Sequence, residues 1–218
     1  LAALVKQFKG SLAAEHGVPL MPGTGAATLP ELRAFLETQQ RRDARAAILL
    51  KAVAGGGGRG MRIVREAAEL DASFARCQAE ALAAFGVGEV YAERLIERAR
   101  HLEVQVLGDG RQVMSLGERE CTLQRRFQKL VEIAPSPGLN PALREQLIQA
   151  ALTLARASAY RGLGTFEFLV DEASADLPFV FIEANPRLQV EHTVTEEVTG
   201  VDLVQAQIAV AAGQPLAA

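Results

Sequence analysis

The sequence predicts an α+β protein with a small unit built around a glycine-rich loop and a larger unit built on an antiparallel sheet. Strand patterns come in clusters between amphipathic helices, and not in the regular strand–helix alternation of a parallel sheet. Four consecutive glycines join two short strand patterns, and the sequence pattern changes near residue 95. We therefore expect a linker helix over residues 1–20, a small unit over 21–95 and a larger unit over 96–218.

The small unit is expected to contain helices packed on short strands. Apolar residues at helical spacing predict an N-terminal helix that ends at Gly17, and a turn-rich hinge follows it. Pro30 lies near the start of the next helical pattern, where proline is tolerated. Apolar runs on either side of the glycines predict strands. The expected elements are helices over 1–16, 29–41 and 66–85, and strands over 46–53, 61–64 and 89–96.

The larger unit is expected to begin with a hairpin. Two alternating segments flank Gly108-Asp109-Gly110, a sequence typical of a turn between paired strands. A proline-rich break then precedes an amphipathic helix with Pro141 in its first turn. The expected elements are strands over 101–109, 112–126, 164–171 and 178–189, a helix over 141–160, and a mostly helical stretch over 196–213.

The composition is that of a globular protein without a basic surface field. Of the 218 residues, 49% are hydrophobic and 22% are charged, and the net charge of −3 does not favour nucleic acid or anionic membranes. No apolar run reaches the ~20 residues of a membrane span. Cys77 and Cys121 have no metal-ligand spacing, which favours buried thiols in a reducing compartment and a cytoplasmic protein. The chain opens at Leu1, inside a helical pattern, so we also expect a piece of a longer polypeptide.

The stretch KAVAGGGGRGMRIV, residues 51–64, places the glycines between two expected strands. Glycine lets backbone N–H groups approach an anion closely, and Lys51 and Arg59 would add charge-assisted bonds. The spacing fits neither the P-loop nor the dinucleotide-binding pattern, because the glycines lead into a strand. A flap over a phosphate and a flexible hairpin turn are equally compatible with this stretch. Its four glycines are Gly55, Gly56, Gly57 and Gly58.

Two acidic residues lie in strongly apolar strand patterns, Glu167 in GTFEFLVD and Glu183 in FVFIEANPR. A carboxylate on a strand that faces a core is unfavourable unless it is paired or bound to a metal. If the two strands pair, both carboxylates can face one pocket with Asn185, which lies two residues further on. These oxygen ligands suit Mg²⁺ that also contacts phosphates. The alternative is a pair of strand-edge glutamates that face water.

The segment NPRLQVEH places Arg187, Gln189 and Glu191 at alternate positions, so an extended backbone would present all three to one side. An arginine that holds an anion, an amide that orients it and a carboxylate that takes a proton would form a general-base site. A polar loop rim is an equal alternative. In ECTLQRRFQKLVE, the basic residues around Lys129 favour a phosphate or carboxylate ligand over nucleic acid, because aromatic residues are few. His101, at a strand start, is more often structural than catalytic.

Five stretches, in their order along the chain, resemble the biotin carboxylase family of ATP-grasp enzymes over nearly the whole sequence. They are KAVAGGGGRGMRIV, VYAERLIERARHLEVQVLGDG, ERECTLQRRFQKLVEIAPSPG, GTFEFLV and FIEANPRLQVEHTVTEEVTGVDL. The resemblance implies an ATP-grasp fold, with residues 21–95 as the lid (B) subdomain and 96–218 as part of the C-terminal subdomain. It implies carboxylation of biotin through carboxyphosphate, with ATP, bicarbonate and Mg²⁺ or Mn²⁺. It also implies a biotin carboxyl carrier domain, a carboxyltransferase and an oligomeric parent enzyme.

The resemblance also implies roles for individual residues. The glycine loop would close over the ATP phosphates, and Glu191 would deprotonate bicarbonate. The residues implied to bind the nucleotide are Lys6, Lys51, Glu93, Ile96, His101 and Gln124. Those implied to hold the metal are Glu167, Glu183 and Asn185. Those implied to hold bicarbonate or carboxyphosphate are Lys129, Arg187, Gln189 and Val190.

The chain departs from the family pattern at Phe127, where many relatives carry histidine, and in having four glycines where some have five. The family's N-terminal nucleotide-fold domain, a further C-terminal arginine and a biotin-acceptor A-M-K-M stretch are not found in the sequence. We therefore expect the isolated chain to be inactive or nearly so. Another ATP-grasp ligase, such as a carbamoyl-phosphate synthase, and a non-catalytic binding module are the alternatives.

Overall fold

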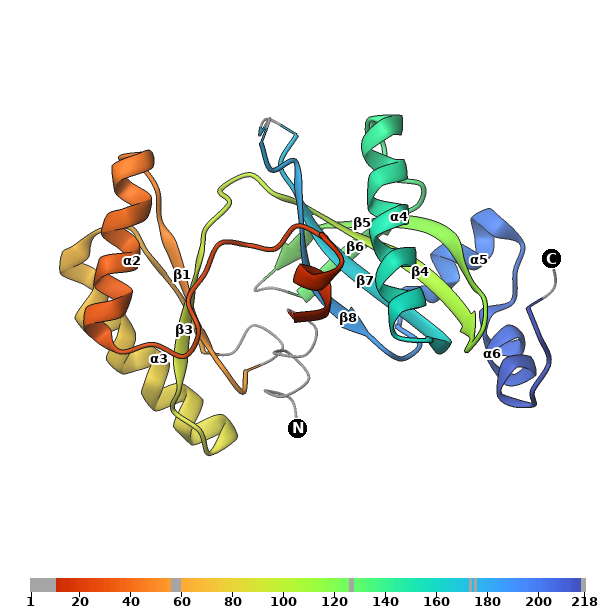
Figure 1. Cartoon of the computed structure of the whole chain (residues 1–218), viewed down its shortest axis with the longest axis horizontal. Helices are drawn as coiled ribbons and strands as arrows, with labels where there is room; N and C mark the ends of the chain where they lie inside the picture. The colour runs from red at the N-terminus through yellow and green to blue at the C-terminus, as the bar shows by residue number, and fades with distance from the viewer. Residues whose placement is uncertain (1–10, 56–59, 126–127, 173, 175, 217–218) are drawn as a thin grey trace. The chain divides into compact units, whose positions relative to one another are not determined.

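The computed structural model describes residues 11–55, 60–125, 128–172, 174 and 176–216. The chain divides into two compact units, and the main division falls between Glu97 and Arg98 (Figure 1). Within the described residues, no helix has both the length and the apolar character needed to cross a membrane. The mixture of helices and antiparallel strands confirms the predicted α+β class.

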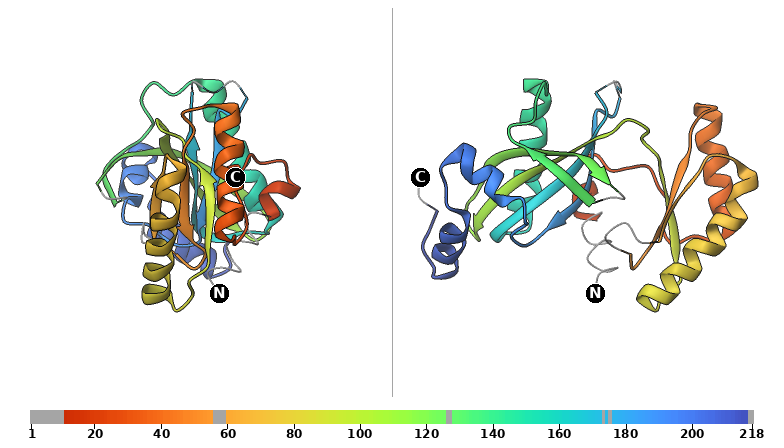
Figure 2. Two further views of the ribbon diagram at one scale, coloured as in Figure 1. Left: turned by 90° about the vertical axis from the view of Figure 1, so that its left-hand side faces the viewer. Right: turned by 180° about the vertical axis from the view of Figure 1, so that it is seen from behind.

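The first unit is a three-stranded antiparallel sheet with strand order β2-β1-β3. Helices α2 and α3 lie on one face of this sheet (Figure 2). Alternate residues of the central strand, Ile48 and Leu50, pack with Leu32 and Leu36 in an apolar core, so Lys51 lies on the face away from the helices. The elements are α2 (Leu29–Arg42), β1 (Ile48–Ala52), β2 (Met61–Val64), the 3₁₀ turn η1 (Ala67–Glu69), α3 (Leu70–Phe85) and β3 (Val90–Arg94).

Local sequence signals explain where these helices begin and end. The backbone N–H of Thr28 donates to the Glu31 carboxylate at 2.7 Å, and Pro30 occupies the first turn of α2. Gly86 takes φ +72°, a conformation that glycine adopts without strain, and α3 ends there. The helix expected over 66–85 begins at Leu70 instead, because a short 3₁₀ turn precedes it.

The second unit is a five-stranded antiparallel sheet with strand order β6-β5-β4-β7-β8. Helix α4 covers one face, where Leu147 and Leu154 pack with Val104 and Phe166. The short helical stretch at residues 11–15 contributes Ala13 to the same core. The elements are β4 (Arg100–Asp109), β5 (Val113–Arg125), β6 (Gln128–Ile133), α4 (Pro141–Ala157), β7 (Arg161–Val170), β8 (Phe179–Asn185), α5 (His192–Thr199) and α6 (Leu203–Ala211).

The strands of the second unit differ from the expected ones in two places. Strand β6 was not expected, and it forms one edge of the sheet. Strand β8 ends at Asn185, four residues before the expected limit, because the chain turns there into α5. The mostly helical stretch expected over 196–213 is confirmed. It contains the end of α5, which begins at His192, and the whole of α6, and Gly200 at φ +72° ends α5 between them.

Candidate functional site

The sheet face opposite α4 carries a cluster of charged side chains centred on Lys129 of β6. The Lys129 ammonium donates to Glu103 Oε2 and to Glu191 Oε1, each at 2.5 Å. It also lies 3.4 Å from Glu167 Oε1. These carboxylates come from β4, from the N-cap residue just before α5, and from β7, so the fold brings together groups that are far apart in sequence.

The charged forms of Lys129 and Glu191 are each favoured by neighbouring charges. Burial alone would lower the pKa of the Lys129 ammonium, but the carboxylates of Glu103 and Glu167 outweigh it and raise that pKa above its ordinary value. Burial would raise the pKa of Glu191, but the hydrogen bond from Lys129 and its charge hold it below the ordinary value. Glu191 is therefore an ionised carboxylate at neutral pH, able to accept a proton, and it lies beside a cation that can hold an anion.

Glu167, only 5% exposed, gathers donors from four other residues. His101 Nε2 donates to its Oε2 at 2.7 Å, and Gln189 Nε2 donates to its Oε1 at 3.2 Å. Gln124 Nε2 donates to His101 Nδ1 at 2.7 Å, which leaves the ring proton on Nε2, facing Glu167. Burial would raise the pKa of Glu167, but the bond from His101 and the charge of Lys129 lower it to about 2. The predicted site residues His101 and Gln189 thus contact one carboxylate, and the predicted residue Gln124 contacts it through His101.

The predicted metal ligands also lie together. Glu167 and Glu183 are opposite each other in the β7–β8 ladder, with a register shift just after Glu167. Asn185 Nδ2 donates to Glu167 Oε1 at 2.7 Å and to Glu183 Oε1 at 3.3 Å. Two carboxylates and an amide that can turn its oxygen toward them are the hard donors that Mg²⁺ takes. The donor set fits a divalent cation, and the role of these residues as its ligands remains a prediction.

Several charged residues on this face were not predicted from the sequence. Arg119 and Glu103 are fully buried, and Arg119 Nε donates to Glu103 Oε1 at 2.7 Å. Glu103 also comes close to Cys121 and Glu132, where one ligand atom from each lies within 4.8 Å of the others. Burial raises the pKa of Glu132 and of the Cys121 thiol. The available signal was a charged residue inside an apolar strand, as in HLEVQV and GERECT.

The expected arrangement of the NPRLQVEH segment was wrong. The backbone is not extended, because the chain turns at residues 190–191 and enters α5. Gln189 is buried against Glu167, and Glu191 pairs with Lys129, so these two side chains do reach the cluster. Arg187 is exposed and its Nη1 donates to the carbonyl oxygen of the next residue, Leu188, at 3.2 Å. The side chain of Val190 is also exposed.

In the first unit, Lys51 and Glu93 form an ion pair on the sheet face away from the helices. Lys51 Nζ lies 2.5 Å from Glu93 Oε2, and it stands 5.9 Å from the centre of the Tyr91 ring. Gly55 N donates to Ala52 O at 3.0 Å, at the start of the glycine loop. Ile96 is half-buried just beyond the end of β3. The predicted residues Lys6, Gly56, Gly57 and Gly58, and Phe127, lie outside the described residues.

Comparison with known proteins identifies the family. Residues 6–218 match the family model of the carbamoyl-phosphate synthase L chain, ATP binding domain. A pyruvate carboxylase from Aspergillus niger is 49% identical over 208 residues, which are 94% of this chain and 17% of that protein. The chain therefore spans about a sixth of the length of this relative.

Similarity to solved structures supports the same family assignment. A biotin carboxylase complex from Campylobacter jejuni superposes with a TM-score of 0.87 at 41% identity, covering 100% of this chain and 48% of that one. The biotin carboxylase domain of a Hydrogenobacter thermophilus 2-oxoglutarate carboxylase, solved with MgADP, ADP and bicarbonate, superposes with a TM-score of 0.86 at 42% identity. That match covers 100% of this chain and 46% of the other. The chain has the ATP-grasp fold and belongs to the carbamoyl-phosphate synthase L chain ATP-binding family, in its biotin carboxylase group.

Proposed function

We propose that this chain is the ATP-grasp part of a biotin carboxylase and takes part in the ATP- and bicarbonate-dependent carboxylation of biotin. The observation that carries the proposal is the half-buried Lys129–Glu191 pair beside the Glu167, Glu183 and Asn185 group. One side of this cluster can bind and deprotonate a small anion, and the other can hold a divalent cation. The relatives named pyruvate carboxylase and biotin carboxylase support the same proposal.

The chemistry follows from the charges in the cluster. Bicarbonate is a poor nucleophile until it loses its proton, and Glu191 is an ionised carboxylate that can take that proton. A bicarbonate oxygen then attacks the γ-phosphorus of ATP, which forms carboxyphosphate and releases ADP. Lys129 holds the anion and offsets the repulsion between two negatively charged reactants. When bound, Mg²⁺ or Mn²⁺ held by Glu167, Glu183 and Asn185 would neutralise charge on the phosphates.

The first unit is proposed to bind the nucleotide. Lys51 would contact a phosphate, and the segment from Glu93 to Ile96 would contact the adenine. The glycine loop after Lys51 would cover the phosphates and exclude the water that hydrolyses carboxyphosphate. We accordingly propose residues 21–95 as the lid subdomain and 96–218 as part of the C-terminal ATP-grasp subdomain.

The proposed reaction also requires partners. Carboxybiotin must be formed on a biotin carboxyl carrier domain and then used by a carboxyltransferase, in an oligomeric parent enzyme. The pyruvate carboxylase and 2-oxoglutarate carboxylase relatives support partners of this kind. A cytoplasmic location is proposed from the composition and from the two free, buried cysteines, Cys77 and Cys121.

The experiment that tests the function measures ADP formation by the intact carboxylase that contains this chain. Bicarbonate alone is expected to support slow ADP release, and free biotin is expected to accelerate it. Ammonia in place of biotin is the control acceptor, because carbamoyl-phosphate synthases share the same ATP-binding family. Acceleration by ammonia and not by biotin would contradict the proposal and favour a carbamoyl-phosphate-forming enzyme.

A further inference from the structure

Arg119 of β5 is a fully buried cation that the proposed chemistry does not use directly. Its Nε donates to Glu103 Oε1 at 2.7 Å, and its Nη2 lies 2.5 Å from the same oxygen. Its Nη1 donates to Gln105 Oε1 at 2.9 Å and to Thr195 Oγ1 at 2.7 Å. These three partners are each at most 1% exposed. Such a set of acceptors is needed because a buried charge without partners is strongly destabilising.

The contacts of Arg119 complete a closed circuit of hydrogen bonds. This circuit includes the proposed catalytic pair, Lys129 and Glu191. Glu103 uses Oε1 for Arg119 and Oε2 for Lys129, so one carboxylate fixes both cations. Lys129 donates to Glu191, which is the N-cap residue of α5. Thr195 lies one helical turn further along α5, and its hydroxyl returns to Arg119. Arg119 therefore controls both ends of the Lys129–Glu191 contact, one through Glu103 and the other through α5.

We propose that Arg119 is a positioning residue for bicarbonate activation, holding Lys129 through Glu103 and Glu191 through Thr195. This inference rests on the proposed function and adds to it a residue that touches neither bicarbonate nor nucleotide. If the Thr195 hydroxyl no longer accepts the hydrogen bond from Arg119, α5 loses its bond to this buried arginine. Glu191 is then free to shift relative to Lys129. A shift of this kind lowers kcat/KM for bicarbonate, because the reaction depends on the placement of both the Lys129 ammonium and the Glu191 carboxylate.

A purely structural ion pair would behave differently. Arg144 of α4 makes such a pair with Glu118 of β5, with Nε and Oε1 2.8 Å apart and the Glu118 side chain 3% exposed. Arg144 also donates to the carbonyl oxygen of Ser136, so it ties α4 and a loop to the sheet. Loss of either arginine is expected to lower the melting temperature. Only loss of the contacts that Arg119 makes with Glu103 and Thr195 is expected to change kcat/KM for bicarbonate.

The test replaces Thr195 and Thr199 in the intact carboxylase. Thr195→Val keeps the shape of the side chain and removes the hydroxyl that accepts from Arg119, whereas Thr195→Ser keeps the hydroxyl. Thr199→Val is the matched control, because the Thr199 hydroxyl donates to the carbonyl oxygen of Thr195, on the same helix. The measurements are kcat and KM for bicarbonate in ADP formation, the affinity for ATP, and the melting temperature.

Thr195→Val is expected to lower kcat/KM for bicarbonate about tenfold, the scale of a hydrogen bond to a charged group. The affinity for ATP should stay at the wild-type value, Thr195→Ser should restore bicarbonate use, and Thr199→Val should leave it unchanged. If Thr195→Val melts below the assay temperature, Thr195→Ala replaces it, since alanine needs less room. Wild-type bicarbonate kinetics in the valine or alanine variant would overturn the inference, as would an equal loss in Thr199→Val. A wild-type enzyme without bicarbonate-dependent ADP formation would instead contradict the proposed function.

Discussion

Glu191→Gln is expected to reduce bicarbonate-dependent ADP formation in the intact carboxylase by about 10³-fold, within the range for loss of a general base. Glutamine has nearly the shape of glutamate and can still accept the hydrogen bond from Lys129, now 2.5 Å from Glu191 Oε1. It has no basic oxygen that could take the bicarbonate proton. The variant should therefore fold and bind ATP as the wild type does, while kcat falls at saturating bicarbonate.

The matched control is Glu197→Gln, because Glu197 lies on the same helix and is exposed. This control should keep the wild-type rate, which shows that the loss in Glu191→Gln does not come from the charge of α5. The rate of the Glu191→Gln enzyme should also be insensitive to pH near the pKa of the wild-type base. Turnover close to wild type in Glu191→Gln would remove Glu191 from the role of base.

Lys129→Met is expected to have the second large effect, on both stability and activity. It removes the ammonium that contacts Glu103, Glu191 and Glu167, and it leaves their largely buried carboxylates close together. Breaking a buried ion pair by removing one partner costs about 3–5 kcal/mol. Bicarbonate-dependent ADP formation should be lost as well, because the ammonium that contacts Glu191 and is proposed to hold the anion is gone.

The loss of unfolding free energy caused by Lys129→Met should be smaller at pH 4 than at pH 7. In the wild type, Lys129 holds the pKa of Glu191 below its ordinary value, so this pair stabilises the fold above that ordinary value and loses its effect as pH falls. In the variant the hydrogen bond and the charge of Lys129 no longer lower the pKa of Glu191, while burial, the largest influence, still raises it against its own backbone N–H and the charge of Arg119. Glu191 is therefore protonated at a higher pH in the folded variant than in the folded wild type. The difference in unfolding free energy between the two proteins should therefore shrink from pH 7 to pH 4, measured by urea unfolding.

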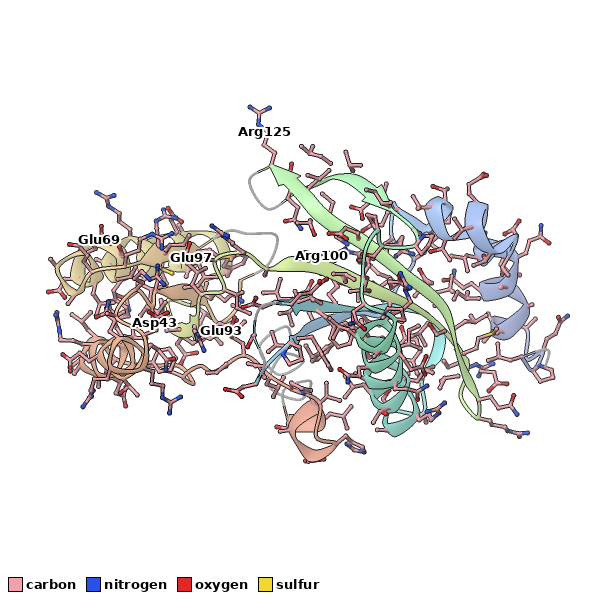
Figure 3. The ribbon with its side chains drawn as sticks, turned by 90° about the horizontal axis from the view of Figure 1, so that it is seen from above. Asp43, Glu69, Glu93, Glu97, Arg100 and Arg125 are labelled. Atoms are coloured by element: carbon pink, nitrogen blue, oxygen red, sulfur yellow. The ribbon has the colours of Figure 1, made fainter. Side chains whose placement is uncertain are left out.

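Arg125→Met is the control for this experiment, because Arg125 is exposed at the end of β5 and points away from the sheet in Figure 3. It should change the unfolding free energy by no more than about 0.5 kcal/mol at either pH. An equally small change in Lys129→Met would contradict the central position of Lys129 in the cluster.

The sequence allowed part of this site to be predicted because strand alternation is local information. Glu167, Glu183 and Asn185 stand in apolar strands at positions that share a face, and the structure places them together. The pairing of Arg119 with Glu103 could not be predicted, since it depends on the register between β4 and β5. That register shifts between Val104 and Val106, and no local pattern reveals such a shift.

The position of Arg187 shows a second limit. Alternate spacing in NPRLQVEH predicts a common side only if the backbone stays extended, and here it turns at residues 190–191 to begin α5. Strand β6 was missed for a related reason. As an edge strand it exposes Leu130 and Val131, so its apolar residues do not mark a buried face. Edge strands and turns depend on tertiary partners that a single sequence does not specify.

The most direct test of the account follows the oxygen atoms of bicarbonate. The intact carboxylase is incubated with ATP and ¹⁸O-labelled bicarbonate, and the inorganic phosphate is analysed by mass spectrometry. Because a bicarbonate oxygen attacks the γ-phosphorus, one labelled oxygen should appear in each phosphate released, and Glu191→Gln should release almost none. Phosphate that carries oxygen from water alone, in an enzyme that releases ADP at the wild-type rate, would show that bicarbonate does not attack ATP and would contradict the proposed function.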